Sequence, residues 1–180
     1  NFGLSGTLLA YADCPIVLHP KFENKKIRQL VEGYGRALFL GDELLFRNWA
    51  ESHGARYYVH SMGEFSEINP ELQMRYFVNA VEPSSVAAAR LMEFAPNDSR
   101  FFVPLYQNLK YRVYGIITSH DERQAVDLLA TASIFKQQGN IGMAETMATL
   151  AMQYDPLNQR VQRFLLGLSE NCASSTTNHP

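Results

Sequence analysis

The sequence predicts an α/β fold: a small mixed sheet flanked by helices, followed by a helical hairpin. Apolar residues recur at helical spacing in residues 27–38, and aromatic and β-branched residues flank a short polar turn in residues 100–117. Small residues recur in residues 125–156 at the spacing of two packed helices. We expect three parts: a small α/β domain over 1–117, helices over 123–170, and a polar, disordered tail over 171–180.

Composition excludes several classes of function. The chain has 180 residues, 46% of them apolar, and a net charge of −2, which gives no electrostatic basis for binding nucleic acid. No apolar run approaches the ~20 residues of a membrane-spanning helix. Two cysteines, Cys14 and Cys172, make neither a disulfide framework nor a zinc site. We therefore expect no metal and no cofactor.

The first half of the chain reads as a strand, a helical crossover and a second strand. Pro15–Leu18 is a short apolar run, and a helix should follow Asn24. Gly41 and Asp42 interrupt it before a second helix, and Arg56–Ser61 reads as a buried strand. Such a βαβ unit favours parallel strands joined by a right-handed connection.

The next elements are a loop, two helices and a hairpin. Residues 62–70 form the loop, and a helix should start near Pro70. The second helix, from Pro83, carries its apolar face on Ala87, Leu91 and Phe94. The hairpin strands are 100–106 and 111–117, and Pro104 should face outward on an edge or sit at a bulge. Residues 118–123 are the expected joint to the helical part.

Residues 125–156 resemble a tetratricopeptide repeat, a helix–turn–helix unit that serves for docking or capping. Thr131 and Ala148 depart from its usual leucine and aromatic residue. The positions that should pack the repeat, turn it and end it are Leu128, Ala132, Phe135, Gly139, Ala144, Ala148, Ala151 and Pro156. A lone repeat cannot form a groove, so the helices should either dimerise or cover the hairpin with the apolar faces of residues 128–135 and 164–168.

Four residues are candidates for binding a ligand, and none forms a catalytic set. His19 and Glu23 follow the expected first strand, where open α/β sheets bind ligands. His19 can equally satisfy a local carbonyl while Asn24 caps the next helix. His60 and Glu64 flank the end of the second strand, but the sequence there lacks the glycines of a phosphate-binding loop.

The tyrosines of the expected strands have two interpretations. They could line a sugar-binding face by stacking, or they could pack the strands together with their hydroxyls hydrogen-bonded. The second interpretation is the more common in proteins. The residues concerned are Tyr57, Tyr58, Tyr106, Tyr111 and Tyr114.

The order of these segments resembles a known class of membrane-protein domain. The segments are 3–11, 14–23, 54–60 and the hairpin 102–116 with its pattern Phe-Val-Pro-Leu-Tyr-Gln-Asn and Tyr-Arg-Val-Tyr-Gly-Ile. They resemble the soluble extracytoplasmic domain that follows the last transmembrane helix in bacterial GT-C glycosyltransferases, relatives of oligosaccharyltransferases. In that class the catalytic acids lie in the membrane part, so the resemblance implies no catalytic residue here.

The resemblance implies a non-catalytic domain of a lipid-phosphate-sugar-dependent glycosyltransferase at the extracytoplasmic face of a bacterial membrane. The domain would position a glycosylation acceptor or a protein partner, and an upstream transmembrane region would hold it at the membrane. Two alternatives remain: a stand-alone interaction protein whose repeat binds a peptide, and an α/β enzyme that uses His19 and Glu23.

Overall fold

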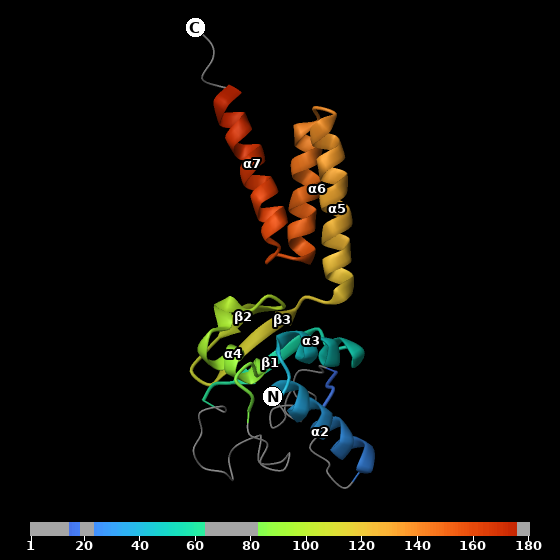
Figure 1. Cartoon of the computed structure of the whole chain (residues 1–180), viewed down its shortest axis with the longest axis vertical. Coiled ribbons are helices and arrows are strands. Elements are labelled where there is room, and N and C mark those ends of the chain that lie inside the picture. The colour runs from blue at the N-terminus through green and yellow to red at the C-terminus, as the bar shows by residue number, and fades with distance from the viewer. Residues whose placement is uncertain (1–14, 19–23, 64–82, 176–180) are drawn as a thin grey trace. The chain divides into compact units, whose positions relative to one another are not determined.

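The computed structural model describes residues 15–18, 24–63 and 83–175, and the chain divides into two compact units (Figure 1). The first, Asn1–Ile116, contains a three-stranded sheet and helices, and the second, Ile117–Pro180, is helical. The chain is therefore a mixed α/β protein, as the sequence predicts. The helix expected to start near Pro70 lies outside the described residues.

Two capped helices open the described part of the first unit. Helix α2 spans Lys25–Phe39, and the Asn24 side chain accepts a hydrogen bond from the amide of Lys26 at its N-terminus. Helix α3 spans Glu43–Ser52, and Asp42 caps it in the same way. These caps satisfy amides that have no partner within the helix, so both predicted helix starts are confirmed.

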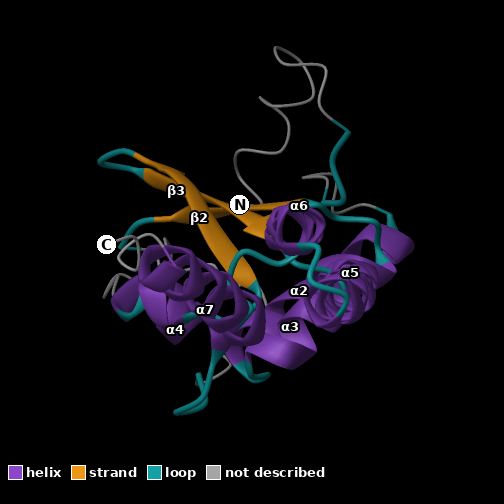
Figure 2. Cartoon of the chain, turned by 90° about the horizontal axis from the view of Figure 1, so that it is seen from above, coloured by secondary structure: helices purple, strands orange, loops and turns teal. Residues whose placement is uncertain are grey.

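The sheet is antiparallel throughout, so the predicted βαβ unit and mixed sheet are wrong. Strands β1 (Tyr57–Ser61), β2 (Phe102–Gln107) and β3 (Tyr111–Ile116) lie in the order β1-β3-β2, shown in orange in Figure 2. The hairpin β2–β3 is confirmed. Strand β1 pairs with β3, so that the inward-facing Tyr58 and His60 lie opposite Tyr114 and Arg112. No described strand lies parallel to β1.

The expected first strand, Pro15–Leu18, is irregular backbone and pairs with no described strand. Leu18 is instead buried among side chains of the helices and the sheet. A short apolar run is compatible with either role, and here its burial comes from packing alone.

Helix α4 (Ala88–Phe94) is present, but its buried face is not the one predicted. Ala87, just before the helix, is buried as predicted, but within the helix Ala88, Ala89 and Met92 are buried, Leu91 is half-buried and Phe94 is exposed. The single helical turn Pro96–Asp98 follows. In β2 the register shifts between Pro104 and Tyr106, which confirms that the proline lies at a bulge on an edge strand.

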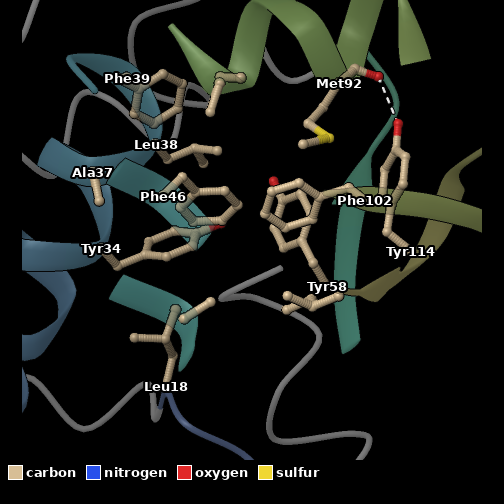
Figure 3. Packing of buried hydrophobic residues seen from close by; sticks show 14 of the residues in the cluster. Leu18, Tyr34, Ala37, Leu38, Phe39, Phe46, Tyr58, Met92, Phe102 and Tyr114 are labelled. Carbon is tan, nitrogen blue, oxygen red and sulfur yellow. Dashed lines mark hydrogen bonds between the residues drawn. The ribbon is translucent and has the colours of Figure 1, made fainter. Parts of the chain in front are cut away.

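The core of the first unit is aromatic (Figure 3). Phe46 of α3 stacks on Phe102 of β2, with ring centroids 5.3 Å apart, and meets Tyr58 of β1 edge-on at 5.0 Å. Leu38 and Met92 close the cluster from α2 and α4. Large rings from α2, α3 and the three strands bury enough apolar area to hold the sheet against the helices.

Three helices form the second unit: α5 (Ser119–Gln137), α6 (Ile141–Tyr154) and α7 (Gln159–Ser175). Thr118 and Asp121 form a reciprocal capping box at the start of α5. The helix therefore begins inside the expected joint, residues 118–123. Likewise, α7 extends to Ser175, so the prediction of a disordered tail is wrong for residues 171–175.

Gly139 makes the turn between α5 and α6 with φ +78°, a conformation that costs glycine little. The side chains between the two helices are small: Ala132, Ala144, Ala148 and Ala151 are fully buried. Helix α7 adds Val161 and Leu165 to a cluster that includes Ala151. The helices thus bury apolar faces against one another, and packing onto the hairpin of the first unit stays a prediction, as does the repeat family.

The buried alanines predict that α5 and α6 tolerate no larger side chain between them. We expect Ala144→Leu to lower the free energy of unfolding by about 1–3 kcal/mol, because added methyl groups in a packed core force the helices apart. Urea denaturation would measure it. Ala130→Leu on the exposed side of α5 is the matched control and should be nearly neutral; equal effects of the two would contradict close packing at Ala144.

Candidate functional site

Of the four predicted binding residues, the structure describes His60; His19, Glu23 and Glu64 lie outside the described residues. His60 is on β1, where side chains alternate between the two faces of the sheet. Tyr58 and His60 point inward and are buried, and the His60 residue is only 2% exposed. Its imidazole therefore belongs to the interior of the first unit.

Glu93, which no sequence pattern indicates, is the partner of His60. Its carboxylate lies 2.6 Å from Nε2 of His60 and also accepts a hydrogen bond of 2.8 Å from the backbone amide of Gly63. Because an ionised carboxylate only accepts, Nε2 carries the proton, and the Tyr58 hydroxyl donates to Nδ1 across 3.2 Å. Both ring nitrogens of His60 are satisfied.

The position of Glu93 depends on how α4 is anchored. The amide of Ala88, the first residue of α4, donates to the carbonyl of Gly41 between α2 and α3. A Cβ at Gly41 would come within 2.7 Å of the carbonyl oxygen of Ala37, so this close turn requires glycine. The anchored helix then carries Glu93 to the end of β1.

Arg112, the cross-strand neighbour of His60 on β3, forms a second set of hydrogen bonds. Its guanidinium donates to the carbonyl of Met92 (2.6 Å), the hydroxyl of Tyr114 (3.1 Å) and the side chain of Gln107 (2.8 Å). The Tyr114 hydroxyl donates to the same Met92 carbonyl (3.0 Å; Figure 3). These bonds tie the C-terminal end of α4 to the sheet.

The electrostatics of the cluster follow from its burial. Burial lowers the pKa of His60, and the charge of Arg112 acts in the same direction, whereas the hydrogen bond and charge of Glu93 oppose them. Burial likewise raises the pKa of Tyr114, and Arg112 opposes that shift. His60 is therefore neutral at pH 7, consistent with one donating and one accepting ring nitrogen.

Tyr58, His60 and Glu93 are linked by hydrogen bonds in the sequence hydroxyl, imidazole and carboxylate, as in a catalytic triad, but the hydroxyl is not available to a substrate. Tyr58 is buried and packs against Phe46 and Tyr114, with ring centroids 5.0 and 6.0 Å away. We assign the cluster a structural role: it fixes the turn at Gly63 and helix α4 to the sheet.

A second polar cluster fixes the start of β2. Glu43, in the first turn of α3, accepts hydrogen bonds from the Ser99 hydroxyl and from the amide of Phe101. The Ser99 hydroxyl in turn accepts one from the amide of Phe102. The Arg47 guanidinium lies over the Phe101 ring, 4.6 Å from its centroid. These contacts also serve packing.

Within the part of the chain that the structure describes, no three His, Cys, Asp or Glu side chains gather where they could hold a metal ion.

The tyrosines of the sheet differ in burial according to the face on which they lie. Tyr58 and Tyr114 are buried, whereas Tyr57 and Tyr106 are exposed on the other face of the sheet and Tyr111 is half-buried. The packing interpretation thus holds for the first pair alone.

Part of the buried cluster has a signal in the sequence. In β1 and β3 the polar His60 and Arg112 stand in phase with Tyr58 and Tyr114, two residues away, so a buried polar pair could be expected once the strands are paired. Glu93 has no such signal, because the prediction placed the wrong face of its helix inward.

The chain matches no protein-family model, and neither a curated protein nor a solved structure shows significant similarity to it.

Stability should depend on pH through His60. Its pKa is lower in the folded chain than the ordinary 6.5, so unfolding takes up a proton at mildly acidic pH. We expect the free energy of unfolding to fall as pH drops below about 6.5, by at most about 1.4 kcal/mol per pH unit for one histidine. Urea denaturation at several pH values would show this.

His60→Gln should flatten this pH profile, because it removes the imidazole whose pKa burial lowers. A His60→Gln protein with the wild-type slope would contradict the assignment.

Glu93→Ala should be strongly destabilising, because it removes the carboxylate that accepts hydrogen bonds from the His60 ring and the Gly63 amide. We expect a loss of about 2–4 kcal/mol in the free energy of unfolding. The control is Glu32→Ala, which removes an exposed carboxylate paired with Arg36 at 2.9 Å and should cost about 0–1 kcal/mol. Comparable losses in the two variants would argue against a structural role for Glu93.

Proposed function

We propose that the chain is a non-catalytic domain of a membrane-embedded, lipid-phosphate-sugar-dependent glycosyltransferase. In this proposal it positions a glycosylation acceptor or a protein partner at the extracytoplasmic face of a bacterial membrane. The observation that carries the proposal is the sheet, since segments 54–60 and 102–116 of the resemblance meet in β1, β2 and β3. Segment 3–11 lies outside the described residues.

The buried polar cluster supports a non-catalytic role. His60, the one candidate that the structure describes, is enclosed by Tyr58, Glu93 and Arg112 and has both ring nitrogens engaged. A general base must reach the proton that it removes, and this imidazole reaches none beyond its neighbours.

Among the described helices, none is long and apolar enough to cross a membrane.

The helical unit supports a second candidate, a stand-alone interaction protein. Met143, Met147, Leu150 and Tyr154 follow one another on one face of α6 at helical spacing, beside the buried alanines. Met143, Leu150 and Tyr154 are exposed. An exposed apolar stripe of this kind suits an amphipathic partner helix.

The gene upstream of Asn1 distinguishes the two candidates. Several hydrophobic spans in the same reading frame would support the membrane enzyme, because the catalytic part of such enzymes lies in the membrane. A start codon shortly upstream would instead support the stand-alone interaction protein.

We expect the purified chain neither to transfer nor to hydrolyse sugar supplied as polyprenyl-phosphate glucose, because His60, the candidate that the structure describes, is buried with both ring nitrogens engaged. Product formation can be followed by mass spectrometry. His19→Ala and Glu23→Ala should leave this result unchanged. Measurable turnover that either substitution abolishes would favour the α/β enzyme instead.

A further inference from the structure

One face of the sheet carries exposed aromatic side chains and no charge. Helices α2, α3 and α4 pack on the inner face, through the core that contains Tyr58, Phe102 and Tyr114. On the outer face, Tyr57 is 68% exposed, and Leu105 and Tyr106 are each 57% exposed. The other residues that alternation places outward are Val59, Ser61, Val103, Tyr111, Val113 and Gly115.

The bulge in β2 helps to build this outer face. It places Leu105 directly over Gly115, where an added Cβ would lie 3.2 Å from the Leu105 side chain. Tyr106 then pairs with Val113 on the same face, and Asn108 donates a hydrogen bond to the Tyr106 hydroxyl across 3.4 Å. Side chains that would otherwise alternate are therefore adjacent.

The size of the outer face argues against a large protein partner. Three strands of five or six residues cover about 15 Å by 20 Å, or about 300 Å². A stable protein interface, including a dimer of this chain, needs about 800 Å² on each partner. Exposed apolar patches of about this size are frequently functional, so a smaller ligand is the better fit.

The charge of the outer face argues against nucleic acid. Aromatic sheets that stack nucleobases also carry basic groups for the phosphates. None of the outward residues is charged, and the whole chain carries a net charge of −2. A neutral ligand is therefore the better match.

We propose that the outer face of the sheet, through Tyr57 and Tyr106, binds a neutral oligosaccharide. The face of an aromatic ring is electron-rich and attracts the weakly positive C–H groups of a sugar ring, while the tyrosine hydroxyls can bond to sugar hydroxyls. The two tyrosines lie on opposite edge strands, with Leu105 and Val113 between them, so they can contact successive sugar units. This inference rests on the sheet face alone and does not require the membrane enzyme.

The test is an NMR titration of the full chain with maltohexaose, cellohexaose and chitohexaose. We expect at least one to shift the amides of the outer-face strands with a Kd of about 1 mM or tighter. Tyr57→Ala and Tyr106→Ala should each weaken binding about two- to tenfold, and Tyr106→Phe, which keeps the ring, should retain most of it. Both positions are exposed, so the variants should fold; circular dichroism checks this.

Tyr154→Ala removes an exposed tyrosine of α6, outside the sheet. It is the matched control and should bind like the wild type. Absence of shifts with all three saccharides would overturn the proposal, as would binding that Tyr57→Ala and Tyr106→Ala leave unchanged. If instead oligothymidylate or phosphatidylcholine vesicles, and no saccharide, bind through these tyrosines, the face serves a different ligand and the proposal is likewise wrong.

Discussion

The first unit depends most on the hydrogen bonds that the carboxylate of Glu93 accepts. It accepts hydrogen bonds from His60 on β1 and from the amide of Gly63 in the following turn, and so joins α4 to the sheet. A buried charge is tolerated only when such partners surround it. Any other placement of α4 against β1 would leave this carboxylate without its hydrogen-bond donors, at a cost in free energy. The pairing therefore selects this arrangement of α4 and β1 more strictly than apolar packing alone would.

Because the inner face of the sheet is committed to this cluster and to the aromatic core, the outer face is the part of the sheet that can meet a ligand. The two faces differ in chemistry, although they alternate along the same strands. Inward lie His60 and Arg112 with buried rings; outward lie exposed tyrosines and no charge. The sheet thus combines a buried, hydrogen-bonded inner face with a neutral outer face.

The helical unit follows a different principle. Its helices approach closely because the side chains between them are alanines, and its polar groups act mainly as caps and turns. Thr118 and Asp121 begin α5, and Asn140 begins α6. Small contacts of this kind gain less from each buried side chain than the aromatic core does, so the third helix, with Val161 and Leu165, completes the apolar cluster.

The sequence by itself determined the helix starts at Asn24 and Asp42, the hairpin and the turn at Gly139. Each of these features depends on residues only a few positions apart. Tertiary structure alone decided the antiparallel pairing of β1 with β3, the irregular course of Pro15–Leu18 and the inward face of α4. The Glu93–His60 pair spans 33 residues. No local pattern encodes such a contact, since it exists only after the aromatic core and the Gly41 turn have set where α4 lies.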